Sequence, residues 1–215
     1  MSKSICIMGS SGSGKTTSMR NLDPETTVYF DCDGKGLSWK GWREQYNTNH
    51  KNYIRTDEPE VIQKSMMTID KSENYKHIKT IVIDTLNGIM VSEELRRVND
   101  KGYDKWMSLA VYVWTIIQMS NRMRDDLTVI MIAHSETVSD DNGYLETRMK
   151  TSGRKLEKMV PETQFTTVLL SDCIEGRYVY HTRADHSSCK TPMGAFEEEL
   201  IDNDITEVIK ALEEF

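Results

Sequence analysis

The stretch Gly9-Ser10-Ser11-Gly12-Ser13-Gly14-Lys15-Thr16 decides the fold of this chain. It fits the pattern G-x-x-x-x-G-K-[ST], in which a glycine-rich turn wraps the phosphates of a nucleotide. The apolar run from Ser4 to Met8 predicts a strand before the turn, and the residues from Lys15 to Asn21 are compatible with a helix after it. A flexible Gly/Ser linker is the alternative, but a linker does not follow directly on an apolar strand. The order strand, loop, helix therefore predicts a phosphate-binding loop.

Each residue type of this loop suits a chemical task. The glycines let the backbone turn its N–H groups inward, which forms a nest for anions. The N-terminus of the following helix adds the positive end of its dipole. We expect Lys15 to reach the β- and γ-phosphates, the Thr16 hydroxyl to bind Mg²⁺, and Thr17 to complete the contacts to the nucleotide.

Composition limits the possible classes of function. The chain has 215 residues and a formal net charge of −7, which predicts one domain with a core of ordinary size. Residues 194–215 hold eight acidic side chains and one lysine, so this acidic segment carries the whole net charge. A generally basic nucleic-acid binder is thereby excluded, whereas a local basic patch is not.

Several features favour a cytoplasmic protein. The four cysteines are scattered without a C-x-x-C pair, which is typical of reduced thiols. The apolar stretches are too short to cross a bilayer. The first residues pass directly into the predicted strand and leave no room for a signal peptide.

Predicted strands alternate with predicted helices along the chain. The strands are residues 4–8, 26–31, 52–54, 80–84, 127–133, 165–170 and 177–182. The helices are residues 15–21, one that Pro59 opens, 89–98, 106–123, one near Leu156, and one that starts at Asp204 with Glu207 placed for a capping box. This alternation predicts a single α/β domain over residues 1–215, with a mainly parallel central sheet flanked by helices.

Asp84 is the candidate metal ligand. It ends the apolar strand 80–84, and ligands bind at the carboxyl ends of strands in open α/β sheets. We therefore expect Asp84 and Thr16 to hold Mg²⁺ between them, although an aspartate that merely starts a turn is the alternative.

The base for hydrolysis has to come from another strand, because Thr85 follows Asp84 where many ATPases of this kind place a glutamate. Asp31 continues the strand 26–31, so Asp33, in the looser turn Cys32-Asp33-Gly34, is the better candidate. A solvated turn carboxylate is the alternative. His134 follows the most apolar strand and could touch the γ-phosphate or its attacking water, or could be a hydrogen-bonded histidine at the rim.

Taken in order, these positions resemble the RecA-like P-loop ATPases, above all the small phage-encoded ATP-binding proteins of single-strand annealing and recombination. The resemblance covers nearly the whole chain and rests on the phosphate loop and on residues 29–34, 81–85, 131–134 and 190–191. It implies ATP rather than GTP, Mg²⁺, and hydrolysis with a base after the second strand, where Asp33 replaces the usual glutamate. It further implies that His134 is a switch residue.

The resemblance also makes the segment 135–160 a DNA-contacting loop. Arg148, Lys150, Arg154 and Lys155 supply cations there that suit the phosphates of single-stranded DNA. A solvated loop is the alternative. Trp39 and Trp42 could stack bases, but packing is the favoured interpretation. The acidic segment 194–215 could compete with DNA for a basic groove, although a solubilising end is favoured.

The resemblance implies a homo-oligomer, either a ring or a filament, in which a basic residue completes the neighbouring site. Arg183 and Lys190 match that region, with ordinary surface charge as the alternative. A single-strand-binding protein is a further expected partner, and a bacterial host cytoplasm the expected location. Two rival functions share the phosphate loop. They are a small-molecule phosphotransferase, for which no arginine-rich lid is found, and a nucleotide-dependent protein-binding module with little turnover.

Overall fold

The computed structural model of the chain describes residues 2–99, 104–139, 142–152 and 154–215, with side chains for all of these except residues 104–106 and 154–155. Its strands are β1 (Lys3–Gly9), β2 (Thr27–Asp31), β3 (Tyr53–Arg55), β4 (Thr80–Asp84), β5 (Thr128–Ser139), β6 (Leu145–Met149), β7 (Thr167–Ile174), β8 (Arg177–His181) and β9 (Leu200–Asp202). Its α-helices are α1 (Trp42–Gln45), α2 (Pro59–Lys71), α3 (Leu86–Arg96), α4 (Asp104–Ser120), α5 (Arg154–Met159) and α6 (Ile205–Ala211). Short 3₁₀ turns are η1 (Thr17–Met19), η2 (Glu73–Tyr75) and η3 (Pro161–Gln164).

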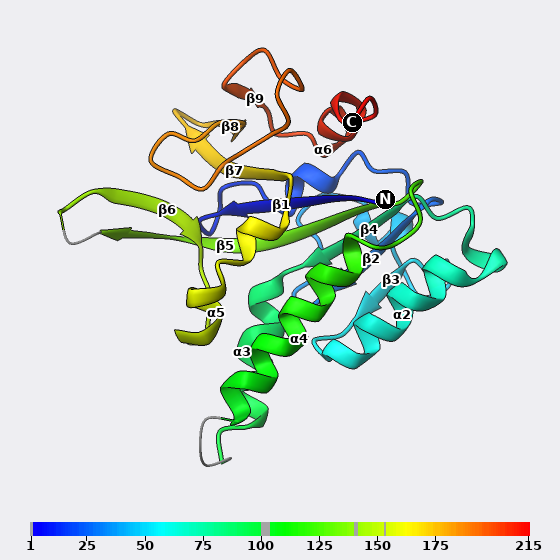
Figure 1. Ribbon diagram of the computed structural model, residues 1–215. Helices are drawn as coiled ribbons and strands as arrows, with labels where there is room; N and C mark the ends of the chain where they lie inside the picture. Colours follow the sequence, from blue (N-terminus) through cyan, green and yellow to red (C-terminus); the bar gives the residue numbers. More distant parts are fainter. Residues whose placement is uncertain (1, 100–103, 140–141, 153) are drawn as a thin grey trace.

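One sheet runs through the molecule in the order β3-β2-β4-β5-β1-β7-β8-β9 (Figure 1). The strands from β3 to β7 along this order are parallel, whereas β8 and β9 continue the sheet in antiparallel pairing. The predicted α/β class with a mainly parallel sheet is therefore confirmed.

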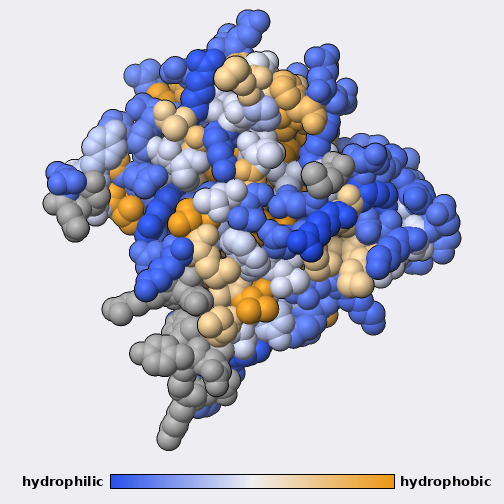
Figure 2. Space-filling model, viewed as in Figure 1, coloured by the Kyte–Doolittle hydropathy of each residue, from blue (hydrophilic) through white to orange (hydrophobic). Residues whose placement is uncertain are grey.

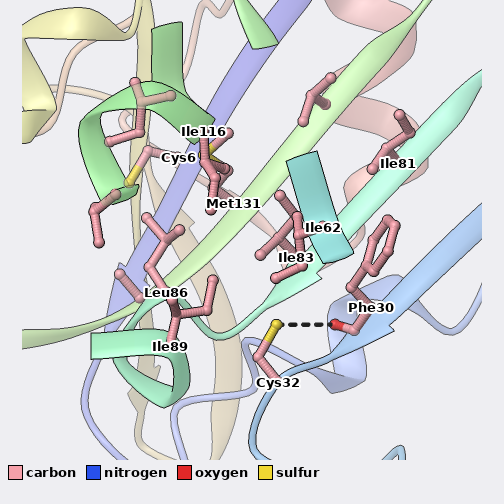
Figure 3. Packing of buried hydrophobic residues seen from close by; sticks show 14 of the residues in the cluster. Cys6, Phe30, Cys32, Ile62, Ile81, Ile83, Leu86, Ile89, Ile116 and Met131 are labelled. Atoms are coloured by element: carbon pink, nitrogen blue, oxygen red, sulfur yellow. Dashed lines mark hydrogen bonds between the residues drawn. The ribbon is translucent and has the colours of Figure 1, made fainter. Parts of the chain in front are cut away.

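The central strands are buried on both faces, because their side chains alternate between two apolar clusters. In β4, Ile81 and Ile83 face the cluster formed with α2, α3 and α4, while Val82 faces the opposite one. Figure 3 shows part of the first cluster, where Ile81, Ile83 and Met131 lie beside Ile62 of α2 and Leu86 of α3. The second cluster includes residues of η1 and α6. Helices thus cover both faces of the sheet.

The prediction of a helix over residues 15–21 is wrong, because only the 3₁₀ turn η1 forms there. Threonines and a serine at positions 16–18 are poor helix formers, and Pro24 follows soon after. A turn this short contributes little dipole, so backbone N–H groups and Lys15 dominate the field at the phosphate loop.

The strand predicted for residues 127–133 continues to Ser139. Beyond His134 it leaves the parallel sheet and pairs with β6 as an antiparallel hairpin, in which Ser135 lies opposite Met149. The predicted loop 135–160 is therefore mostly this hairpin and α5.

The acidic segment 194–215 packs against the rest of the domain, while most of its acidic side chains stay exposed, so the favoured interpretation as a solubilising end stays a prediction. β9 extends the sheet, and Ile205, Val208 and Leu212 of α6 are buried. Asp204 caps α6 by accepting from the Thr206 N–H at 3.0 Å. The apolar stripe of α6 outweighs the charges on its other side, as in any amphipathic surface helix.

Hydrophilic side chains cover most of the face seen in Figure 2, and hydrophobic ones show as small separate areas. Large apolar side chains exposed on α3 and α4 include Leu95 and Val111. Among the residues described here, no helix has the length and apolar character needed to cross a membrane.

Candidate nucleotide-binding site

The carboxyl ends of four parallel strands bring the predicted site residues together. Asp31 ends β2 and pairs with Asp84, which ends β4. Asp84 also pairs with Ile132 of β5, two residues before His134, and His134 pairs with Gly9 at the end of β1. Because β5 separates β1 from β4, His134 lies between the start of the phosphate loop and Asp84.

The phosphate loop is held by residues from the other end of the chain. Gly12 and Gly14 have φ angles of +81° and +93°, which favour glycine. A Cβ on Gly14 would lie 2.9 Å from the Tyr178 ring and 3.0 Å from Asn203 Oδ1, so this glycine is also needed for close packing. The Ser171 hydroxyl donates to the Ser13 carbonyl at 2.6 Å. The loop is thus buttressed from β7, β8 and the residue after β9.

Lys15 folds back over its own loop. Its ammonium donates to the carbonyls of Gly9 at 2.8 Å and Ser10 at 2.5 Å, and the residue is only 7% exposed. Burial lowers the pKa of Lys15 to about 8, against the opposite influence of the Asp84 carboxylate. A buried ammonium at the mouth of a glycine loop is suited to a polyphosphate anion, which would restore its charge balance.

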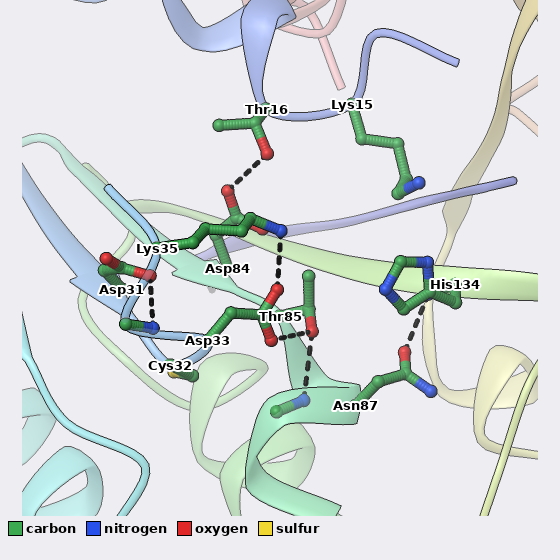
Figure 4. A network of polar contacts seen from close by, with 12 residues as sticks. Lys15, Thr16, Asp31, Cys32, Asp33, Lys35, Asp84, Thr85, Asn87 and His134 are labelled. Atoms are coloured by element: carbon green, nitrogen blue, oxygen red, sulfur yellow. Dashed lines mark hydrogen bonds and ion pairs between the residues drawn. The ribbon is translucent and has the colours of Figure 1, made fainter. Parts of the chain in front are cut away.

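Thr16 and Asp84 lie in direct contact. Thr16 Oγ1 donates to Asp84 Oδ2 at 2.7 Å, and the buried Tyr29 hydroxyl donates to the same oxygen at 2.6 Å (Figure 4). Burial raises the pKa of Asp84, opposed by these two hydrogen bonds. The other oxygen, Oδ1, is buried without a hydrogen-bond partner.

This donor set fits Mg²⁺. An unpartnered carboxylate oxygen beside a threonine hydroxyl is the kind of ligand pair that a hard cation takes. No group of three His, Cys, Asp or Glu side chains able to hold a metal ion occurs within the described part of the chain. A magnesium ion here would therefore complete its shell with phosphate oxygens and water, as is usual for this ion.

Asp33, the candidate base, is held at both carboxylate oxygens. Oδ1 accepts from the Thr85 hydroxyl at 3.0 Å, and Oδ2 lies 2.6 Å from the Lys35 ammonium. Thr85 also caps α3 by accepting from the Gly88 N–H at 3.0 Å. A Cβ on Gly88 would come 2.5 Å from Asp33 Oδ1, so glycine leaves room for the carboxylate. Asp33 thus sits on the start of α3, close to Asp84.

Asp31 shapes the turn that carries Asp33. Its carboxylate accepts from the N–H groups of Gly34 and Gly36, at 2.9 and 2.8 Å, and from the Tyr53 hydroxyl at 2.6 Å. These three hydrogen bonds engage both carboxylate oxygens, which gives Asp31 a structural role in the turn, and the role of Asp33 as the base stays a prediction.

His134 is tied to α3 and to the hairpin through its backbone. Its N–H donates to Asn87 Oδ1 at 2.7 Å, its carbonyl accepts from the Lys150 N–H at 2.8 Å, and Asn87 Nδ2 donates to the Lys150 carbonyl at 2.9 Å. Burial and then the nearby Lys15 lower the pKa of the ring, which favours neutral imidazole. His134, Asn87, Gly88 and Asp33 line one cleft of about 560 Å³.

The predicted DNA-contacting cations differ in their surroundings. Arg148 is ion-paired with Glu136 at 3.3 Å and with Glu157 at 2.8 Å, so its charge is already compensated. Lys150 is exposed at the end of β6, close enough to His134 to affect the ring. The side chains of Arg154 and Lys155 lie outside the described residues.

The contacts of Arg183 and Lys190, the two candidates for completing a neighbouring site, involve residues outside the phosphate loop. Arg183 donates to the carbonyls of Phe196 and Glu197 and faces Glu199 at 3.8 Å. Lys190 pairs through its backbone with Val168. Their roles between subunits stay predictions.

The two tryptophans pack within the domain. Trp39 Nε1 donates to Gln45 Oε1 at 2.7 Å, and the Trp42 ring lies 5.3 Å from that of Tyr53. The favoured interpretation as packing residues therefore agrees with the structure.

Sequence reasoning missed three residues of the site: Tyr29, Lys35 and Asn87. Tyr29 reads as an ordinary apolar strand position, and Asn87 as an ordinary residue of the first helical turn. Lys35 had a signal, since it stands between two glycines directly after the candidate base.

Comparison with known proteins also supports a nucleotide-binding site. None of the curated proteins compared with this chain matches it. A family model described as an AAA domain matches residues 1–190, which include the phosphate loop, Asp33, Asp84 and His134. The chain therefore belongs to this AAA-domain family of P-loop ATPases.

Proposed function

We propose that this protein binds and hydrolyses Mg-ATP, and that its nucleotide state controls binding to single-stranded DNA. The observation that carries the nucleotide part is the contact between Thr16 and Asp84 beside the glycine loop, with Asp84 Oδ1 left unpartnered. The family membership supports nucleotide binding in general. Adenine, magnesium and hydrolysis are our proposals.

Catalysis rests on positioning and electrostatics. The loop N–H groups and Lys15 balance the charge of the phosphates, while Thr16 and Asp84 would hold Mg²⁺, which would offset part of the phosphate charge. Asp33 orients a water whose oxygen attacks the γ-phosphorus. The bond to the bridging oxygen breaks, its electron pair stays with ADP, and the water proton passes to Asp33.

Replacement of the loop lysine tests the nucleotide part. We expect Lys15→Ala to lose ATP turnover by about a hundredfold or more, the size of loss seen when one charge-stabilising donor is removed. A phosphate-release assay measures it, with Lys79→Ala at the opposite end of β4 as the control. Full activity in Lys15→Ala would overturn the assignment.

The DNA part of the proposal is supported by the hydrogen bonds that join His134 to Lys150, one directly between their backbones and two through the Asn87 side chain. They connect the nucleotide site to the hairpin β5–β6, which offers the exposed Lys150 to a phosphate backbone. We propose a homo-oligomer, a ring or filament, that acts in phage recombination, annealing or replication, together with a single-strand-binding protein.

ATPase activity with and without single-stranded DNA, at several salt concentrations, tests this second part. Stimulation that fades with salt supports it, because phosphate contacts release counterions. The pairing of Asp33 with both Lys35 and Thr85 favours one alternative, a nucleotide-dependent protein-binding module with little turnover. ATP binding without stimulation and without a nucleotide-dependent change in size would favour that module.

A further inference from the structure

The turn after β2 presents a second lysine to the nucleotide site. Gly34 and Gly36 flank Lys35 with φ angles of +67° and +81°, and both donate their N–H groups to the buried Asp31 carboxylate. These bonds fix the backbone on either side of Lys35. Figure 4 shows its side chain extending from the turn toward the space between Asp33 and Asp84. The turn therefore fixes the point from which the Lys35 side chain starts, on the side of the site next to Asp33.

The Lys35 ammonium is held in place by one direct partner. It lies 2.6 Å from Asp33 Oδ2, and its side chain is 50% exposed. Burial works against its charge, but the hydrogen bond to Asp33 and the nearby Asp84 carboxylate outweigh this and raise the pKa of Lys35. An exposed ion pair of this kind is weak and exchanges partners easily.

Lys35 and Lys15 approach the site from two different segments, the turn after β2 and the phosphate loop (Figure 4). The charge of Lys35 contributes to the lowered pKa of Lys15 and of the His134 ring, so all three groups lie within electrostatic reach. Two ammonium groups within this reach repel each other, and an anion bound near both relieves the repulsion. A triphosphate bound by the glycine loop supplies such an anion at its terminal phosphate.

We propose that Lys35 is a second phosphate-binding cation, which leaves Asp33 for the terminal phosphate of a bound triphosphate and so releases the Asp33 carboxylate. This inference rests on the proposed function and adds to it a role for Lys35 at the same site. Asp33 then keeps its anchor to Thr85 through Oδ1, while Oδ2 becomes available to water. The base is thereby uncovered only when a γ-phosphate is present, and a diphosphate leaves it paired.

The chain supplies a closely matched control pair. Lys79 lies 2.6 Å from Asp126 Oδ2 and its side chain is 52% exposed, nearly the same as in the pair of Lys35 and Asp33. Lys79 precedes β4 and therefore lies at the opposite end of the sheet from the site. Lys79→Met removes a lysine–aspartate pair of the same length without touching the phosphate loop, while Asp126 keeps its second partner Arg124 at 2.7 Å.

The first experiment measures the dissociation constants of Mg-ADP and of a non-hydrolysable Mg-ATP analogue. We expect Lys35→Met to weaken the triphosphate about tenfold or more, as for the loss of one hydrogen bond to a charged group, and to leave the diphosphate nearly unchanged. Lys35→Arg should retain most of the preference, and Lys79→Met all of it. An equal effect on both nucleotides, or no effect on either, overturns the inference.

The second experiment is a double-mutant cycle on thermal stability with Lys35→Met and Asp33→Asn. We expect coupling between the two positions in the nucleotide-free protein and with ADP, and its loss with the triphosphate analogue. The cycle of Lys79→Met and Asp126→Asn should show the same coupling in every state. Coupling between Lys35 and Asp33 that persists with the analogue contradicts the exchange. A wild-type protein that binds neither nucleotide rejects the proposed function itself.

Discussion

At the scale of single residues, the site depends on which side chains the parallel sheet brings together in space. Thr16, Asp33, Asp84 and His134 do lie together, because each lies at or beyond the carboxyl edge of the parallel part of the sheet. Their roles toward a nucleotide stay predictions. Lys35 could not be chosen over other lysines, since its direction depends on bonds from its flanking glycines to Asp31.

The titration of Lys15 predicts proton uptake when nucleotide binds. Burial sets the pKa of Lys15 at about 8, so above that pH the free protein holds it mostly neutral. Bound phosphates favour the ammonium form and raise this pKa, so the complex binds a proton that the free protein lacks. Calorimetry in two buffers of different ionisation enthalpy, near pH ~8.5, measures the uptake.

The uptake should vanish in Lys15→Met and shrink below the pKa of the free protein, where Lys15 already carries its proton. Equal uptake by the wild type near pH ~6.5 and ~8.5 would contradict this assignment of the titrating group.

At the scale of elements, local pattern identified most strands and helices but not their partners. The sequence Asn142-Gly143 is a hairpin signal, yet the strand 127–133 was ended at the first polar residues. The extension to Ser139 depends on pairing with β6, and a pairing partner cannot be read from one strand alone. Residues 15–21 form no α-helix, although the motif predicts one after the glycine loop. The low helix propensity of the threonines and serine at positions 16–18 was the better guide there.

The start of α3 is predicted to be intolerant of a side chain at Gly88. A Cβ there would come 2.5 Å from Asp33 Oδ1 and 2.6 Å from the Cys32 carbonyl. We expect Gly88→Ala to lower the free energy of unfolding by about 1–3 kcal/mol through overpacking, and to lower ATP turnover by moving Asp33.

Urea denaturation and a phosphate-release assay measure these two effects. Glu94→Ala, at an exposed position of the same helix, should change stability by less than about 0.5 kcal/mol. Gly88→Ala with wild-type stability would show that the turn after β2 shifts freely, against the rigidity argued for it.

The link between α3 and the hairpin is predicted to depend on Asn87. Asn87→Ala leaves the His134 N–H and the Lys150 carbonyl without this partner, at a cost of about 1–3 kcal/mol for each group that stays buried. We expect faster amide hydrogen exchange in residues 135–139 and 145–149, read by mass spectrometry.

Asn121→Ala is the matched control, since Asn121 also donates to a backbone carbonyl, that of Gln164, at 3.0 Å. It should leave exchange in the hairpin unchanged. Unaltered exchange in Asn87→Ala would remove the proposed route from the nucleotide site to Lys150.

At the scale of the whole molecule, the fold class was predictable from alternation, whereas the strand order was not. Neighbouring strands such as β1 and β7 are separated by most of the chain, and only their packing decides the order. The helix that starts at Asp204 was predictable, because the spacing of Ile205, Val208 and Leu212 indicates one apolar face, and these side chains are buried.

Nucleotide binding is predicted to stabilise the entire domain. At a hundredfold excess over Kd, a ligand adds about 2.7 kcal/mol. For a chain of this size, that raises Tm by about 5–10 °C. We expect Asp84→Asn to remove the part of this shift that requires Mg²⁺, because the amide offers the cation no charge.

Differential scanning fluorimetry with Mg-ATP, and with ATP plus a chelator, separates the magnesium-dependent part of the Tm shift from the part due to ATP alone. Asp126→Asn, which changes a carboxylate at the far end of the sheet, should keep the magnesium-dependent part. If Asp84→Asn keeps the magnesium-dependent rise in Tm, the metal binds elsewhere.

The support that Ser171, Tyr178 and Asn203 give to the phosphate loop bears on how the protein is made. During translation the glycine turn is made long before Ser171, Tyr178 and Asn203, the residues that support it. A nascent chain that has reached only Leu170 holds the motif and lacks the parts that keep it in shape. Tight capture of nucleotide is therefore an event of late synthesis, and ribosome-bound fragments of increasing length should acquire it abruptly once Asn203 has left the exit tunnel.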